Sequence, residues 1–506
     1  MNSRFLSTVS VCIISVCCPF HAQTSALLDP LKIGVSEEEN RSVSFTNKEA
    51  AYYYTQSHHN NHPDYSYFAG MNISKNRIFH GYELYANQVL QDNKGAKVEV
   101  FPYKMVRTQQ NGLQEELWMF DHINGIEVGI FSSSARNIGI KILGEQITPL
   151  KSDEEFIYFK SMEGDFVIAV AAKNTGYVST FGNLVSARSD SGGFYIAAAK
   201  SAEEATRLIL DLRKNAMHYK KERIAAMENL LDKHVRIKSS TPNFEKALNW
   251  IELTMDQLVT HQQGYGIYAG VPWFNEYWGR DEFISLPGAV LVTGRFDTAR
   301  QILKSFAEYQ NTDPDSRFFG RVPNIVNPQN IDYHTTDGTP RFVGELLNYV
   351  KYSGDTSVIS ELYPNVKNSI EGALKYWTDD KGYLLHEDNE TWMDARDKNL
   401  VSYSPRGNRA NDIQALWYHQ LQAGIYFAGF MKDSESARKW KQTAEKVKHY
   451  FEQDFVDSSY PYLADRLTEQ GKPEFTIRPN QLFALDLISD KKIWGKAIHT
   501  SWTELV

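Results

Sequence analysis

The chain has 506 residues, a length that excludes one ordinary domain and indicates two or three. Hydrophobic residues make up 42% and charged residues 23%, the composition expected of a globular protein. The formal net charge is -8 and no long basic run occurs, so we expect no nucleic-acid partner.

The N-terminus predicts export. Arg4 gives a short positive region, and residues 5–18 are mostly apolar but too few to span a bilayer. Small residues follow at Ala22 and Ala26, so we interpret 1–23 as a secretory signal, cleaved after one of these alanines. A buried N-terminal helix or strand is the alternative. The signal predicts a periplasmic or secreted protein, and no later stretch is apolar enough to predict a membrane span.

Metal and cofactor motifs are not found in the sequence. All three cysteines lie in the predicted signal, so the mature chain would have no disulfide, no thiol nucleophile and no thiolate metal site. His58, His59 and His62 are close together, but no acid or cysteine completes a zinc spacing, and we expect them to pack or to form hydrogen bonds. There is no glycine-rich phosphate loop, serine elbow or dinucleotide fingerprint. We therefore expect no metal and no cofactor.

Residues 24–200 predict a β domain. Polar and apolar residues alternate in 97–101 and 125–131, as they do in half-buried strands, and 166–171 indicates a more fully buried strand. Turn signals rich in glycine and asparagine separate these segments. We expect a β-sandwich.

The sequence pattern changes from strand-like to helix-like at Ser201. This residue forms a capping box with Glu204 at the start of a predicted helical linker over 201–240. From 241 to 506 helical patterns repeat, and long loops rich in Gly, Pro, Asn and aromatic residues lie between alternate helices. This alternation predicts an α/α toroid with inner and outer helices around a central pocket, so the whole chain is an α+β multidomain protein. The predicted helices cover 243–262, 281–293, 296–311, 341–352, 356–377, 410–430, 433–455 and 480–489.

A first cluster of chemical interest, residues 273–281, combines aromatic rings, acids and an arginine directly before a predicted helix. Trp278 offers a flat apolar face, and Arg280 and Asp281 offer donors and acceptors suited to sugar hydroxyls. The alternative is an Arg-Asp pair that caps the helix, with Asp281 near its positive end. Aromatic residues make up 13% of the chain, which fits a carbohydrate binder or a large aromatic core.

A second cluster, residues 382–394, is a long loop dense in acids that ends at Asp394. Glycoside hydrolysis needs one protonated carboxyl near the leaving oxygen and a second group beyond it; in inverting enzymes the two carboxyls stand roughly 6.5–9.5 Å apart. Trp392 or Met393 would desolvate Asp394 and keep it protonated, as an acid catalyst requires. We therefore expect Asp394 to be catalytic. Three other acids of this loop are interpreted as only solvating it: Glu387, Asp388 and Glu390.

A third cluster lies in residues 320–324, where Arg321 and Asn324 are candidates to bind sugar hydroxyls. Ordinary loop chemistry explains these two residues equally well. Further polar residues, among them Asp337, follow shortly downstream.

Four segments, in order along the chain, resemble the amylo-α-1,6-glucosidase family, which includes the C-terminal catalytic domain of glycogen debranching enzyme. The resemblance extends upstream into the β domain and implies an (α/α)6 toroid. It also implies an inverting, exo-acting α-glucosidase that releases glucose from α-1,6 branch stubs of an α-glucan. The four segments are Trp278-Gly279-Arg280-Asp281, Thr391-Trp392-Met393-Asp394-Ala395, Ala415-Leu416-Trp417-Tyr418 and Ile477-Arg478-Pro479-Asn480-Gln481-Leu482-Phe483-Ala484.

The resemblance also implies roles for individual residues. Asp394 matches the general acid of the family. Arg280 and Asp281 look like the pair that holds the terminal glucose, and Trp278 and Trp392 would line the pocket by the same analogy.

The sequence departs from the family pattern in three respects. It ends at Val506, whereas the family continues with further helices and a loop that carries the general base, so we expect an incomplete toroid whose base lies outside this chain. No glucanotransferase domain precedes the β domain. The export signal favours imported starch, glycogen or maltodextrin fragments as substrates. The alternatives are a truncated chain that binds oligosaccharide without turnover and another toroid exo-glucosidase, such as a trehalase-like enzyme.

Overall fold

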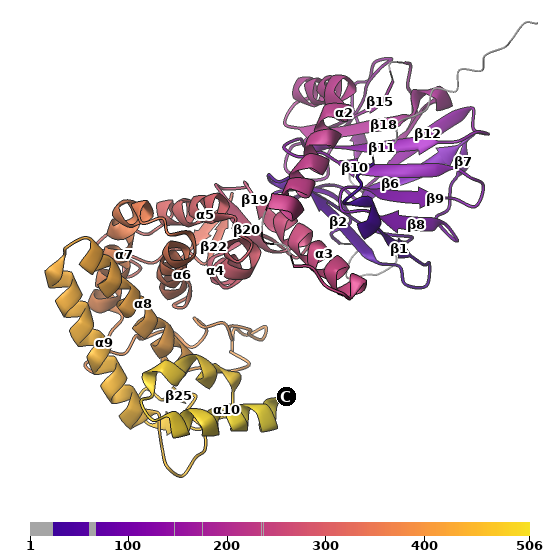
Figure 1. Ribbon diagram of the computed structural model, residues 1–506. Coiled ribbons are helices and arrows are strands. Elements are labelled where there is room, and N and C mark those ends of the chain that lie inside the picture. The colour runs from indigo at the N-terminus through magenta and orange to yellow at the C-terminus, as the bar shows by residue number, and fades with distance from the viewer. Residues whose placement is uncertain (1–23, 60–66, 146, 175, 234, 236) are drawn as a thin grey trace, which may run out of the picture.

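The protein consists of a sheet-rich part followed by a helical part, which lie side by side (Figure 1). The structure, a computed structural model, describes residues 24–59, 67–145, 147–174, 176–233, 235 and 237–506. The predicted export signal, 1–23, and His62 lie outside the described residues.

The described part of residues 24–200 forms three antiparallel sheets. The strands predicted at 97–101, 125–131 and 166–171 are present as β8, β11 and β15. The nine-stranded sheet has the order β1 (Ile33–Val35), β8 (Lys97–Val100), β9 (Met105–Thr108), β10 (Gln114–Met119), β11 (Gly125–Phe131), β18 (Gly193–Ala199), β15 (Val167–Ala172), β14 (Ile157–Lys160) and β13 (Thr148–Pro149). The five-stranded sheet has the order β16 (Ser179–Phe181), β17 (Leu184–Arg188), β12 (Asn137–Leu143), β6 (Gly81–Ala86) and β7 (Val89–Leu90). The four-stranded sheet has the order β2 (Ser42–Thr46), β3 (Ala51–Gln56), β4 (Gly70–Ile73) and β5 (Asn76–Phe79).

The nine-stranded sheet is buried on both faces. Alternation along its strands sends Val128 and Val170 into one core with Ile140 of the five-stranded sheet and Met71 of the four-stranded sheet. The opposite face carries small side chains, such as Ala197, which allow close approach of a covering helix. The near-continuous apolar run of β15 follows from this burial on both sides.

The segment predicted as a helical linker is a structural layer of the β part. It forms α2 (Ala202–Lys233), and Ser201 Oγ accepts a hydrogen bond from the Glu204 amide at 3.1 Å, as an N-cap does. Ile209 and Leu212 of α2 pack on the alanine-rich face of the nine-stranded sheet. The linker prediction was therefore incomplete, because the helix buries its own apolar stripe against that sheet.

The two parts meet through buried charged groups. Asp256 on α3 (Pro242–Leu258) pairs with Lys48 from the β2–β3 turn at 3.0 Å and with Arg295 of the helical part at 2.5 Å. Arg223 of α2 donates to Gln257 Oε1 at 2.8 Å. Since each of these side chains is mostly shielded from solvent, the contacts fix α3 against both parts.

The helical part alternates helices of two layers, which follow one another in an arc (Figure 1). In the first layer α4 (Gly279–Leu286) packs on α6 (Gly338–Ser353), α6 on α8 (Asn411–Phe430), and α8 on the 3-10 helix η4 (Pro479–Leu487). The second layer comprises α5 (Phe296–Glu308), α7 (Ser357–Tyr376) and α9 (Ser434–Asp454), and α10 (Lys491–Leu505) packs on η4. Short strands accompany the described helices in two sheets. The first sheet contains β19 (Val259–Thr260), β20 (Gly266–Gly270), β21 (Phe274–Trp278), β22 (Ile325–Asn327) and β23 (Asn330–Asp332), and the second contains β24 (Arg409–Ala410), β25 (Arg466–Leu467) and β26 (Pro473–Glu474).

Most predicted helices are present within a few residues, but two differ and one further helix was missed. The helix predicted over 281–293 stops at Leu286, because Pro287 lacks an amide donor, and continues as a π-helical turn, η3 (Pro287–Leu291). The segment 480–489 is mostly 3-10 rather than α-helical, and α10 was not predicted.

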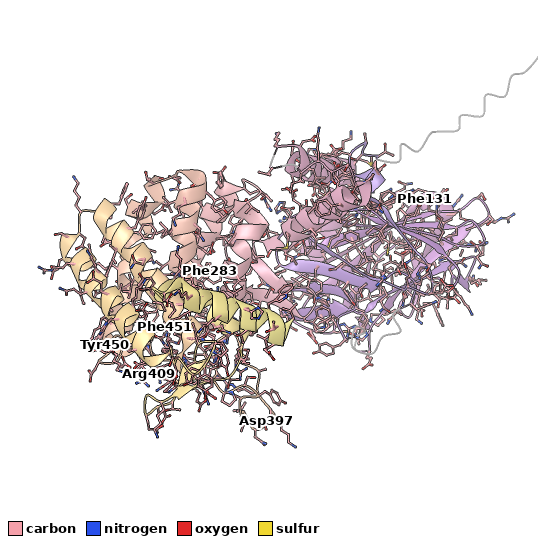
Figure 2. All side chains as sticks on the ribbon, turned by 60° about the horizontal axis from the view of Figure 1, so that its bottom comes forward. Phe131, Phe283, Asp397, Arg409, Tyr450 and Phe451 are labelled. Carbon is pink, nitrogen blue, oxygen red and sulfur yellow. The ribbon has the colours of Figure 1, made fainter. Side chains whose placement is uncertain are left out.

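One large core holds the helical layers together. Phe283 of α4 and Phe451 of α9 both belong to it, and both lie within the helical part in Figure 2. Among the helices that the structure describes, none combines the length and apolar character that crossing a bilayer requires.

Candidate active site

The first-layer helices begin around one loop, residues 387–397. Acidic residues stand at three of these beginnings: Asp281 in the first turn of α4, Asp337 before α6 and Asp412 in the first turn of α8. The N-terminal end of a helix carries partial positive charge, which favours carboxylates there. The loop therefore lies where several helix ends and several carboxylates meet.

Arg280 joins the first two predicted clusters. Its Nη2 donates to Asp394 Oδ2 at 2.7 Å, and its Nη1 donates to the Thr391 carbonyl at 3.0 Å. The same guanidinium lies 3.7 Å from Asp337 and 3.8 Å from Asp281. Its side chain is 8% exposed, so one buried cation organises three carboxylates at the start of α4.

Asp394 is less enclosed than the sequence suggested. Its side chain is 34% exposed and is held by Arg280, so the expected desolvation by Trp392 and Met393 is not what the structure shows. The Trp392 indole donates instead to Asn480 Oδ1 at 3.1 Å. Within the described part of the chain, no donor is placed on Asp394 Oδ1, which leaves this oxygen available to a ligand.

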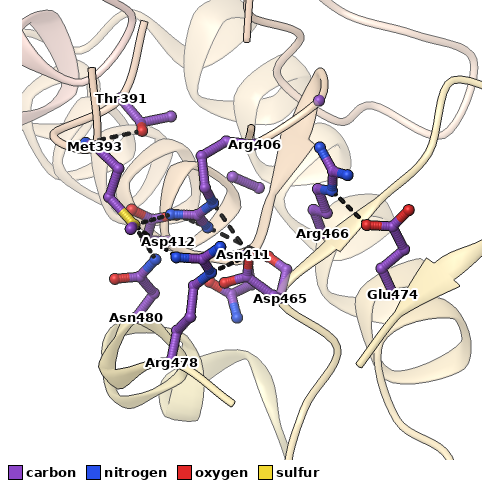
Figure 3. Close-up of polar contacts among 12 residues, drawn as sticks. Thr391, Met393, Arg406, Asn411, Asp412, Asp465, Arg466, Glu474, Arg478 and Asn480 are labelled. Atoms are coloured by element: carbon purple, nitrogen blue, oxygen red, sulfur yellow. Dashed lines mark hydrogen bonds and ion pairs between the residues drawn. The ribbon is translucent and has the colours of Figure 1, made fainter. Parts of the chain in front are cut away.

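Met393 points toward a cluster of polar side chains (Figure 3). Its sulfur accepts from Arg406 at 3.5 Å, Asn480 at 3.5 Å and Arg478 at 3.7 Å. Asp465 binds both arginines, each at 3.2 Å. The loop of Asp394 is thus anchored to the beginning of η4 through one thioether.

Asp337 is a buried carboxylate next to the ligand-accessible Asp394. Burial raises the pKa of Asp337 to about 6, and the nearby Arg280 and Arg341 oppose that rise. Within the described residues neither of its oxygens has a hydrogen-bond partner. Partial burial likewise raises the pKa of Asp281, again against the effect of Arg280. The site therefore contains two kinds of acid. Asp394 is paired with Arg280, whereas Asp337 and Asp281 are poorly solvated and have raised pKa values.

Arg321 lies beneath the loop. It is 6% exposed and donates to Glu390 Oε1 at 2.6 Å, to Thr336 Oγ1 at 3.1 Å and to backbone carbonyls, while its plane covers Trp377 at 4.0 Å. These contacts hold the loop in place, and a direct contact of Arg321 with sugar stays a prediction. Glu390 is 1% exposed, so its interpretation as a loop-solvating acid was wrong. No sequence motif indicated that Arg321 and Glu390 form a buried pair, because the two residues are 69 positions apart.

The other two acids of the loop do stay near the surface, as expected. Glu387 pairs with Arg317 at 2.7 Å, each about half exposed. Asp388 accepts a hydrogen bond from the Gly407 amide at 2.6 Å. Asp397 lies at the outer edge of the loop in Figure 2, and backbone amides lower its pKa.

Asn324 positions the turn that presents Arg280. Its carbonyl accepts from the Gly279 amide at 2.7 Å, and its buried side chain accepts from the Arg280 amide at 3.4 Å. A side chain at Gly279 would place its Cβ 2.4 Å from the Pro323 carbonyl oxygen, so only glycine fits there. Asn324 thus supports the site from behind, and its contact with a sugar stays a prediction.

Trp278 is the last residue of β21, two positions before Arg280, and is partly exposed. Its indole donates to Glu276 Oε1 at 3.3 Å, and its ring meets Phe274 edge-on at 5.7 Å. Trp417, from the third motif, is different: it is fully buried and donates to the Gly382 carbonyl at 3.1 Å. It is a core residue of α8 and does not reach the site.

Sequence reasoning did not single out Arg406, Asp412 or Asp465, which complete the polar cluster. Arg406 is fully buried and donates to Asp412 Oδ1 at 2.9 Å. Burial raises the pKa of Asp465, opposed by its two arginines. Arg406 and Asp465 stand in loops and Asp412 in the first turn of α8, none of them within a recognised motif, so only their convergence in space reveals them.

Comparisons with known proteins agree with this architecture. A family model described as amylo-alpha-1,6-glucosidase matches residues 194–506. A stretch of 87 residues is 36% identical to the glycogen debranching enzyme of Saccharomyces cerevisiae (strain ATCC 204508 / S288c). That stretch covers 16% of this chain and only 5% of the yeast protein.

The fold is similar to that of a bacterial glucoamylase solved in complex with acarbose. The superposition has a TM-score of 0.57 and covers 91% of this chain and 78% of the other. The sequence identity is 14%, so the likeness concerns the fold. It extends over the sheet-rich part and the helical part together.

Proposed function

The chain belongs to the amylo-alpha-1,6-glucosidase family, and on that premise we propose that it is an exo-acting, inverting α-glucosidase of debranching type. Its proposed substrates are α-1,6-linked glucosyl stubs on starch- or glycogen-derived oligosaccharides. A glycosidase activity follows from the family; the linkage and the stereochemical course are the proposal.

The observation that carries the proposal is the 2.7 Å contact between Arg280 Nη2 and Asp394 Oδ2. It joins two motifs that are 114 residues apart at the beginning of a first-layer helix. One motif supplies an acid with an available oxygen, and the other supplies a fixed cation. This is the arrangement needed to orient a carboxyl group toward a bound sugar.

In the proposed reaction Asp394 is the general acid. Protonated Asp394 gives its proton to the glycosidic oxygen as the bond to the anomeric carbon breaks, and a water activated by a second group attacks the opposite face. Arg280 and Asp281 hold hydroxyls of the terminal glucose, and Trp278 and Trp392 supply ring faces. Sugar hydroxyls that bind Arg280 would replace part of its contact with Asp394 and favour the protonated acid.

We propose further that the protein is exported. The support is the signal-like composition of residues 1–23. Fusion of that segment to a reporter tests export independently of catalysis.

The activity is tested by incubating purified protein with branched limit dextrin, isomaltose, maltose and trehalose and measuring free glucose. The proposal expects release from the limit dextrin at the highest kcat/KM, and NMR should show β-glucose as the first anomer, as inversion requires. Preference for trehalose, or α-glucose as the first product, would refute the corresponding part of the proposal. Binding of limit dextrin without any glucose release would establish a binding protein instead.

A further inference from the structure

A cavity of about 450 Å³ lies where the β part meets the helical part, and Asp394 does not line it. Both parts contribute to its wall, and it has no place in the reaction described above. Its lining includes Tyr67, Phe68, Lys75 and Arg77 from the β part and Trp273 and Asn275 from the helical part.

Aromatic rings border this cavity from both sides. Trp273, in the turn between β20 and β21, is 47% exposed, and Tyr67 is 70% exposed. Phe68 meets Tyr67 edge-on at 5.0 Å, so these two rings form one apolar part of the wall, which the Trp273 indole also lines. Exposed rings grouped around a hollow indicate a ligand with flat apolar faces, such as a pyranose.

The charged groups in the wall balance one another. Lys75 and Arg77 stand with Glu145 and Glu163 in the lining. The Lys75 ammonium already binds Glu276 Oε1 at 2.9 Å and Asn275 Oδ1 at 3.1 Å. An anionic ligand would find little uncompensated positive charge here, whereas a neutral polyol finds donors and acceptors of both kinds.

The cavity is connected to the candidate active site along β21. Glu276 Oε1, which accepts from Lys75, also accepts from the Trp278 indole at 3.3 Å. Phe274, 50% exposed, contacts the Trp278 ring and directly follows Trp273. A series of rings therefore leads from the cavity to Trp278, two residues before Arg280.

We propose that this cavity is an accessory glucan-binding site that holds a part of the α-glucan remote from the bond being cleaved. The identity of the ligand rests on the proposed function, whereas the site itself rests on the cavity wall. A long oligosaccharide would reach both the cavity and Arg280, and a disaccharide would reach only one of them. Affinity should therefore rise with chain length through contacts made by Trp273.

The test is calorimetric titration with maltoheptaose and with maltose, in the Asp394→Asn background so that the ligands are not turned over. Trp273→Ala should lower the affinity for maltoheptaose about tenfold, the loss expected for one aromatic contact. The ratio of the maltoheptaose and maltose affinities should fall by the same factor. Trp273→Phe, which keeps a ring, should recover most of the affinity.

Tyr352→Ala is the matched control. Tyr352 is 51% exposed at the far end of α6, remote from the cavity, and its loss should leave the affinity ratio unchanged. Equal maltoheptaose affinities in the parent and in Trp273→Ala, at equal melting temperatures, overturn the site, as does a parent that binds no maltoheptaose. If the wild type releases no glucose yet Trp273→Ala weakens binding, the proposed function fails and the accessory site stands.

Discussion

Asn480 fixes Trp392 through a 3.1 Å hydrogen bond from the indole Nε1 to Oδ1, across 88 residues of sequence. Asn480 is fully buried, and its amide group also donates to the Met393 sulfur at 3.5 Å. A residue of the fourth motif thus sets the orientation of a ring in the second motif. The second and fourth motifs therefore act as one structural unit.

Asn480→Ala should release the indole of Trp392. We expect KM for limit dextrin to rise about tenfold with kcat changed less than threefold, because the ring contributes the same binding to substrate and transition state. Steady-state kinetics measures both constants. Trp392→Phe should give a similar increase, and Asn215→Ala on α2 serves as a control. A fall in kcat with unchanged KM would contradict this role.

Asp394→Asn should lower kcat on limit dextrin by a factor of about 1,000, since an amide cannot donate the proton and general acid catalysis contributes 10²- to 10⁴-fold. The amide oxygen can still accept from Arg280, so the affinity for maltose should stay within about threefold of the wild type. Asp397→Asn, three residues along the same loop, should keep full activity, because the partners of that carboxylate are backbone amides and the Asn399 side chain, all within the loop. A variant with more than a tenth of wild-type kcat would exclude Asp394 as the acid.

Arg321→Met should destabilise the protein by about 3 kcal/mol, because Glu390 would be left as an unpaired buried charge. Adding Glu390→Gln should restore part of this loss, which a double-mutant cycle in urea detects. The exposed pair nearby is a matched control: Arg317→Met with Glu387→Gln should change the free energy of unfolding by at most about 0.5 kcal/mol. If the double variant at 321 and 390 is no more stable than Arg321→Met, the pair does not act as described.

The raised pKa of Glu345 predicts that the free energy of unfolding depends on pH. Its half-buried position on α6 raises its pKa from 4.5 to about 7, so the folded state holds the proton more tightly than the unfolded state. The Glu345 carboxyl therefore contributes to the free energy of unfolding at pH 4, and this contribution is lost as the pH rises from 4.5 through 7.

Glu345→Gln should therefore be more stable than the wild type at pH 8, by at most about 3 kcal/mol, and nearly equal to it at pH 4. Glu361→Gln should behave oppositely at pH 8, because Lys304 and Arg300 lower the pKa of Glu361. Urea unfolding at the two pH values gives both comparisons. A stability difference between wild type and Glu345→Gln that is independent of pH would rule out the titration of this carboxyl.

The sequence allowed regular elements to be predicted where local pattern decides the conformation. β11 shows alternation, and α6 shows helical spacing, because each has one defined buried face. The end of α4 and the 3-10 character of η4 depend on proline and on packing against α8, which a helical pattern does not report.

The sequence allowed individual residues of the candidate site to be proposed, but not which of them contact one another. Arg280 and Asp394 could be proposed separately from their motifs, but their contact requires the fold to bring distant loops together. Glu390 illustrates the limit most clearly, because an acid in an acidic loop is usually solvated and this one lies under Arg321. The family resemblance supplied the expected roles, which stay predictions, and the geometry added which of these side chains are buried against other residues, as Arg321 is against Glu390.

Asp256 has a consequence for how the chain denatures. Its carboxylate is shared by Lys48 from the sheets and Arg295 from the helices, so separating the halves would expose the three charges or leave them unpaired. Heating should therefore melt both halves in a single calorimetric transition. The sheets and the helices would then stabilise each other against heat. A substitution that destabilises either half would lower the melting temperature of the whole enzyme.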